Sequence, residues 1–118
     1  MAAAVTPAAI AAAAGDYIRQ GDLLIHKLDG IDHNAERVEV VLQLAPGTTK
    51  GSRHILSSGD GIDMFTIPGS SELQGPQFVT DREVTVEHPE HGDWILGAGT
   101  YGVTYERMYA EELRRVKD

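Results

Sequence analysis

Two histidines, His88 and His91, occupy the ends of the short segment His88-Pro89-Glu90-His91, which Gly92 follows. Proline favours the second position of a type I turn, so the two histidine Cα atoms are expected to lie within ~7 Å of each other. Apolar runs at residues 84–86 and 94–96 flank this turn and predict a β-hairpin with both imidazoles at its tip. Paired imidazoles can form half of a metal site or an acid–base pair.

Strand alternation indicates the direction of the His88 side chain. Val84 and Val86 share the parity of His88, whereas Glu83 and Glu87 have the opposite parity. His88 is therefore expected to face the interior or the mouth of a barrel. An inward imidazole needs hydrogen-bond partners or a metal ion for its ring nitrogens.

A metal ion needs three or four ligands at ~2.0–2.2 Å, and His54 is the best third candidate. It follows a glycine-rich segment and opens the short apolar run Ile55-Leu56. The predicted metal ligands are therefore His54, His88 and His91, with a carboxylate from Asp60, Asp63, Glu90 or Asp93 to complete the set. Such a site suits zinc, iron, manganese or nickel. The alternative is a polar turn with two solvated histidines, in which His54 is an ordinary loop residue.

The other two histidines are predicted to have structural or surface roles. His26 shares parity with Leu24 and Leu28, which predicts a half-buried, hydrogen-bonded side chain. His33 lies between Asp32 and Asn34 in a polar turn.

Short apolar runs separated by turn residues predict an all-β, mainly antiparallel domain, either a small barrel or a sandwich. The clearest alternation runs from Val38 to Leu44 and predicts one strand. The predicted core consists of Val40, Leu42, Val84, Val86, Trp94, Leu96, Tyr101 and Val103.

Residues 16–109 are predicted to form the β domain, with a helical appendage at each end. The Ala-rich arm, residues 1–15, has Thr6 as a helix cap, Pro7 at the first helical position and Gly15 as a stop. A helix this short is not stable alone, so the arm is expected to dock on its own domain or on a neighbouring subunit. The tail, residues 110–118, is also predicted to be helical.

The chain has 118 residues, a formal net charge of −8 and no cysteine. The length suits one domain, and a small domain gains core by association, so a homo-oligomer is expected. The acidic balance argues against nucleic-acid binding. No apolar run reaches the ~18 residues of a membrane span, and the N-terminus lacks the basic region of a secretion signal, so a cytoplasmic location is expected.

The segment from Gly92 to Tyr101 resembles the second motif of the cupins, which runs Gly-Asp, an apolar strand, Pro-x-Gly and a histidine. Here Gly97 replaces the proline, and Gly102 stands where the ligand histidine of that family is expected. The resemblance implies a cupin-like β fold, but the cupin metal site does not carry over to this chain.

A second resemblance spans roughly residues 21–118. The pattern consists of Gly21-Asp22-Leu23-Leu24-Ile25, Gly51 to His54, His88 to Gly92, Gly99-Thr100-Tyr101 and Arg114 to Asp118. It is similar to that of small uncharacterised proteins of phage and bacterial genomes. In those proteins the first loop reads Gly-His-x-His, whereas Ser52 replaces the first histidine here. The resemblance groups His54 with His88 and His91 but implies no activity.

Two functions remain open from the sequence. The first is a small metal-binding β-barrel protein with a histidine site of unknown chemistry. The second is a non-enzymatic structural or interaction module, of phage or prophage type, that assembles as a homo-oligomer. Whether the chain is an enzyme is left open.

Overall fold

The computed structural model describes residues 16–45 and 54–106. This part of the chain contains nine β-strands and no helix. In chain order they are β1 (Tyr17–Gln20), β2 (Leu23–Leu28), β3 (Glu36–Val38), β4 (Ile55–Leu56), β5 (Ile62–Thr66), β6 (Gln74–Thr80), β7 (Val84–Glu87), β8 (Trp94–Leu96) and β9 (Gly99–Tyr105). The predicted helical appendages lie outside the described residues.

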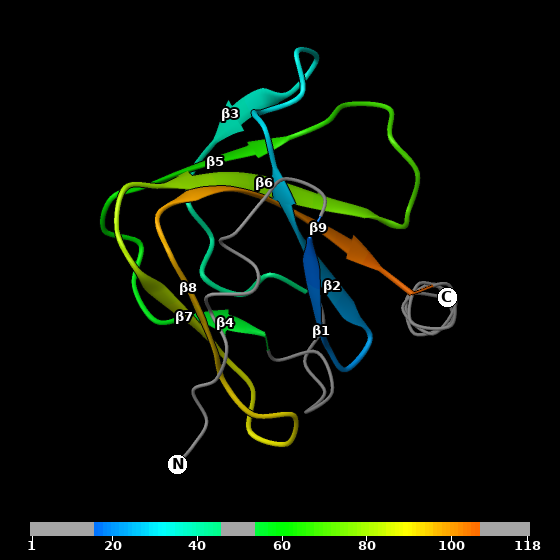
Figure 1. The fold of residues 1–118 in the computed structure, drawn as a ribbon. Helices are drawn as coiled ribbons and strands as arrows, with labels where there is room; N and C mark the ends of the chain where they lie inside the picture. The colour runs from blue at the N-terminus through cyan, green and yellow to red at the C-terminus, as the bar shows by residue number, and fades with distance from the viewer. Residues whose placement is uncertain (1–15, 46–53, 107–118) are drawn as a thin grey trace.

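The strands form two antiparallel sheets (Figure 1). A six-stranded sheet has the order β1-β2-β9-β6-β5-β3, and a three-stranded sheet has the order β4-β7-β8. The predicted all-β antiparallel class is confirmed. The predicted barrel is not formed by the described strands, because β1 and β3 end the larger sheet as separate edges and do not pair with each other.

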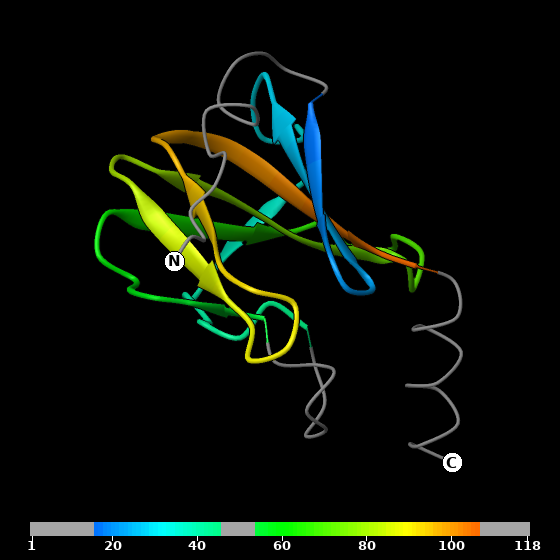
Figure 2. The same ribbon diagram turned by 60° about the horizontal axis from the view of Figure 1, so that its bottom comes forward.

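One long bent hairpin joins the two sheets. Strand β6 pairs with β9 in the larger sheet, and their continuations β7 and β8 pair in the smaller sheet, with Val84 opposite Leu96 and Val86 opposite Trp94. The chain changes sheet at residues 81–83 and again at residues 97–98. The hairpin between residues 84–86 and 94–96, predicted from the sequence, is confirmed. Figure 2 shows the loop at its tip, which joins β7 to β8. His88 and His91 belong to this loop.

Both sheets contribute to a single hydrophobic core. Its buried members include Ile25, Phe78, Tyr101 and Val103 from the larger sheet and Leu56, Val84, Val86 and Leu96 from the smaller sheet. Of the predicted core residues, Val84, Val86, Leu96, Tyr101 and Val103 are buried, and Trp94 is partly buried against the cluster.

The predicted strand from Val38 to Leu44 is wrong, and so is the placement of Val40 and Leu42 in the core. Strand β3 ends at Val38, and Val40 and Leu42 remain 36% and 41% exposed. The chain leaves the larger sheet after Val38 and reaches the edge of the smaller one, where Leu44 N–H donates to the His54 carbonyl at 2.7 Å. This crossing places only Leu44 of the alternating residues in the core.

A first strand that the sequence patterns did not indicate precedes Gly21. Strand β1 pairs with β2 through a two-residue turn, with Gln20 opposite Leu23. Gly21 has φ of +61°, a left-handed conformation that glycine adopts without strain. Among the described residues there is no helix of the length and apolar character needed to cross a membrane.

Candidate functional site

The three histidines grouped by the sequence lie together at the tip of the bent hairpin. His54 and His88 are buried, with 1% and 3% of their surfaces exposed, and His91 is exposed. The ring centroids of His54 and His88 are 4.6 Å apart, and those of His88 and His91 are 4.4 Å apart. The inward direction predicted for His88 is thus confirmed. The alternative of a polar turn with two solvated histidines is wrong for His88, whereas His91 is exposed.

We call His54, His88 and His91 the imidazole cluster. The buried side chain of Gln20 holds this imidazole cluster against the larger sheet. Its Nε2 donates to the carbonyl oxygens of Val86 at 3.0 Å and Gly92 at 2.6 Å. Both amide hydrogens are then used, so Gln20 Oε1 is the atom that meets His54 Nδ1 at 2.8 Å. Because that oxygen can only accept, His54 carries its proton on Nδ1 and its lone pair on Nε2.

His88 has the opposite arrangement. Its Nδ1 accepts the backbone N–H groups of Glu90 at 3.0 Å and His91 at 3.1 Å. The neutral ring therefore carries its proton on Nε2. These two bonds fix the turn, since the imidazole plays the part that an Asp or Asn oxygen plays in an Asx turn. Asp93 also takes part, because its Oδ1 accepts the His88 N–H at 3.3 Å.

The assigned protons determine what the imidazole cluster can do with a metal ion. A metal binds the lone pair of a neutral imidazole, and His54 Nε2 has this form, with Nδ1 held by a second hydrogen-bonding group as in many metal sites. His88 Nδ1 directs its lone pair at the backbone, so this ring becomes a ligand only if its two turn bonds break. Within residues 16–45 and 54–106, no group of three or more His, Asp or Glu side chains has the geometry to hold a metal ion.

Gly21 allows the exposed ring of His91 to pack against the β1–β2 turn. A Cβ atom built on Gly21 would lie 2.6 Å from His91 Cδ2 and 2.8 Å from its Nε2. A cavity of about 300 Å³ is lined by Ile55, Glu87, His88, Pro89 and Asp93. His91 therefore has a close backbone contact, whereas His88 lines a small cavity together with the acidic residues Glu87 and Asp93.

Gln20 is the site residue that the sequence patterns missed. Tyr17 and Arg19 are exposed while Ile18 and Gln20 are buried, which is ordinary strand alternation. The sequence of β1 does not show this alternation, because polar Gln20 stands on the buried face, so the turn residues Gly21-Asp22 were the available signal. The remaining histidines are as predicted: His26 Nε2 pairs with Thr104 Oγ1 at 2.9 Å, and His33 is largely exposed.

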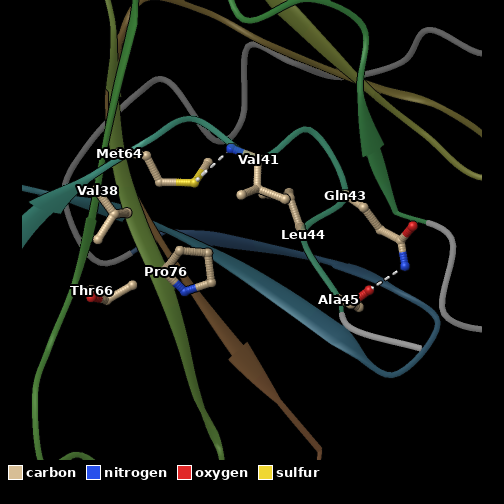
Figure 3. Close-up of a pocket in the computed structure, with 8 residues that line it drawn as sticks. All are labelled: Val38, Val41, Gln43, Leu44, Ala45, Met64, Thr66 and Pro76. Carbon is tan, nitrogen blue, oxygen red and sulfur yellow. Dashed lines mark hydrogen bonds between the residues drawn. The ribbon is translucent and has the colours of Figure 1, made fainter.

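A second feature is an apolar groove of about 400 Å³ beside the β3 edge (Figure 3). We define this apolar groove by the residues that line it: Val38, Val41, Gln43, Leu44, Ala45, Met64, Thr66 and Pro76. None of these lining residues, all from the described part of the chain, carries a charge. Val41 is 56% exposed, although its backbone N–H is directed at the sulfur of Met64 at 3.5 Å.

Pro76 explains why the larger sheet leaves space for the apolar groove. The β5–β6 ladder ends at Phe65 opposite Gln77, and the β6–β9 register shifts between Gln74 and Gln77. Proline has no N–H with which to extend a ladder, so it is found at bulges and irregularities of this kind. The crossing residues 39–42 then pass beside this irregular stretch without adding a strand to the larger sheet.

A family described as a domain of unknown function, DUF8820, matches residues 19–106 of the chain. No curated protein and no solved structure matches the chain. The matched region begins within β1 and ends directly after β9, so it contains the whole bent hairpin and the imidazole cluster. On this match, the chain belongs to the DUF8820 family of domains of unknown function.

Proposed function

We propose that this domain is a non-enzymatic interaction module that binds an apolar polypeptide segment in the apolar groove. The observation that carries the proposal is the exposure of apolar side chains in that groove. Val38 and Val41 line it and are 37% and 56% exposed. Contiguous apolar surface bordered by polar residues is a common mark of a protein-binding site.

The chemistry of the lining limits the class of partner. Among the described residues that line the groove, Gln43 and Thr66 have polar side chains and none is charged. A ligand with a buried charge would lose its hydration without gaining a counter-charge, so an uncharged apolar segment fits best. The neighbouring strand β3 is an edge of the larger sheet, and an edge offers backbone groups to an extended peptide.

Selection from a displayed random peptide library on the full chain tests this function. We expect selected peptides to be apolar and uncharged, and Val41→Asp to weaken their binding by about tenfold or more, because it places a carboxylate in the groove. Tyr17→Asp is the matched control, because Tyr17 is 59% exposed and lies outside the groove. Failure to select any peptide, or equal binding to Val41→Asp, would contradict the proposal.

Metal binding at the imidazole cluster is the second candidate function. The arrangement of Gln20 and His54 favours it, because Gln20 directs the lone pair to His54 Nε2. A divalent zinc, nickel, iron or manganese ion would bind His54 together with His88 or His91. Recruitment of His88 requires the loss of its bonds from the Glu90 and His91 N–H groups, so this binding is expected to rearrange the turn.

Isothermal titration with zinc at about pH 7.5 tests the second candidate. We expect one site per chain, lost in His54→Ala and retained in His33→Ala, a surface control. Affinity is expected to fall on acidification, because protons compete for the imidazole lone pairs. Absence of heat in the metal-stripped chain, or unchanged binding in His54→Ala, would leave the cluster with a structural role alone.

A further inference from the structure

We infer that the occupant of the apolar groove is the Ala-rich arm of a second copy of this chain. The inference rests on the proposed function and names its partner. Two copies related by a two-fold axis would each place residues 1–14 in the groove of the other. Such an exchange is self-complementary and closes at two chains.

The composition of the arm matches the lining of the groove. Residues 1–14 contain nine alanines, no charged side chain, and the larger apolar residues Met1, Val5 and Ile10. The rest of the chain is strongly charged, and its net charge is −8. An uncharged segment avoids the desolvation penalty that a charged side chain would incur in the groove. Small alanine side chains also allow close approach to a surface already occupied by Val38 and Met64.

The positions of the two sheet edges favour exchange between copies. The arm precedes β1 at one edge of the larger sheet, and the groove lies beside β3 at the other edge (Figure 1). Five strand spacings separate these edges in the order β1-β2-β9-β6-β5-β3, which corresponds to roughly 24 Å. The predicted helix, residues 7–14, is only about 12 Å long, and residues 1–6 add at most about 20 Å when extended. An arm that crosses the sheet therefore has only its first few residues left to lie along its own groove.

Exposed apolar surface supplies a reason for association. Val38 and Val41, which line the groove, are 37% and 56% exposed. Burial of apolar surface in a dimer removes it from water in both copies, with a gain of roughly 25 cal/mol for each Å². Small domains have limited core and gain in this way from association.

Sedimentation velocity on four full-length or truncated proteins tests the inference. We expect the wild-type chain and the Tyr17→Asp control to sediment as dimers, and Val41→Asp and the chain lacking residues 1–14 to sediment as monomers. The fluorescence of Trp94 and far-UV circular dichroism check that each protein is folded. A folded monomeric wild type at high micromolar concentration overturns the assignment to a second copy.

A synthetic peptide of residues 1–14 provides the second measurement. It should bind the truncated chain and not the truncated chain that also carries Val41→Asp. Peptide binding by the truncated chain together with a monomeric wild type would place the arm in its own groove and overturn the exchange. If the peptide does not bind but library peptides still require Val41, the inference fails while the proposed interaction function stands.

Discussion

The buried side chain of Gln20 forms hydrogen bonds with three separate segments of the described chain. It lies on β1 in the larger sheet, yet its amide contacts Val86 on β7, Gly92 in the hairpin turn and His54 beside β4. One side chain therefore joins the two sheets by hydrogen bonds inside the protein. A buried polar group of this kind is stabilising only while all its bonds are made.

Replacement of Gln20 by alanine is expected to lower the free energy of unfolding by about 2–4 kcal/mol, because two carbonyls and His54 Nδ1 lose their partner together. Chemical denaturation followed by circular dichroism measures the change. Gln74→Ala is the matched control, since Gln74 is only half-buried and its Nε2 bonds lie within β6 and to β9. Equal effects of the two substitutions would show that Gln20 does not join the sheets energetically.

His26 gives the domain a measurable dependence on pH. Burial lowers the pKa of His26 below its ordinary value. The unfolded chain therefore binds a proton at His26 more readily than the folded chain. The contribution of neutral His26 to the free energy of unfolding is full above pH ~6.5 and is lost as the pH falls toward the lower folded-state pKa. Between about pH 7.5 and pH 5, the loss of stability should be smaller in His26→Gln than in the wild type.

His33→Gln is the control for this measurement, because His33 is exposed. It should lose as much stability as the wild type over the same pH range. Denaturant midpoints at several pH values provide the comparison. A His26→Gln protein with the pH profile of the wild type would contradict a role for His26.

At the scale of the element, the β1–β2 turn and the hairpin tip depend on each other. Gly21 has positive φ, and any Cβ there would meet the ring of His91. Two separate costs are therefore expected for Gly21→Ala: backbone strain and a steric clash. Gly69 has similar φ, +73°, but no atom within 4 Å of its built Cβ, so Gly69→Ala shows the strain alone.

We expect Gly21→Ala to lower the free energy of unfolding by more than the ~1–3 kcal/mol attributable to strain, which Gly69→Ala measures. The excess should disappear when His91→Ala is added, because the smaller side chain removes the clash. Thermal or denaturant unfolding of the three variants gives the result. An excess that persists in the double variant would show that the His91 ring does not cause it.

Much of the β structure could be predicted from local patterns. The alternation of Val84, Val86 and His88 placed His88 inside, and the turn residues identified the hairpin. The crossing after Val38 could not be predicted, because alternation shows only that a face is apolar and not whether the chain stays in one sheet. The role of Gln20 could not be predicted from the sequence either. Its partner His54 is 34 residues away, and its two acceptors are backbone carbonyls, which any residue type can supply.

At the scale of the whole molecule, the two sheets are expected to unfold together. Their buried side chains belong to one hydrophobic cluster, and the bent hairpin passes through both sheets. Trp94, the single tryptophan, reports on the three-stranded sheet, whereas most strand residues lie in the larger sheet. Denaturation curves from Trp94 fluorescence and from far-UV circular dichroism should therefore have the same midpoint and slope.

Separate midpoints for the two signals would show that the sheets are independent units. Gln20→Ala offers a sharper form of this test. If the two curves separate only in that variant, the hydrogen bonds of Gln20 are part of what makes unfolding cooperative.

The pairing of β2 with β9 has a consequence for the order in which the protein forms as it is synthesised. Leu23 lies opposite Tyr105 and Leu28 lies opposite Thr100. Strand β2 therefore gains its partner β9 only after almost all of the described residues have been synthesised. A nascent chain that has not yet reached β9 contains the β1–β2 hairpin and the β5–β6 pair, with no strand between them. A lone hairpin is marginal in water, and closing so long a loop is slow. The larger sheet is therefore completed only after β9 has been synthesised and inserts between β2 and β6.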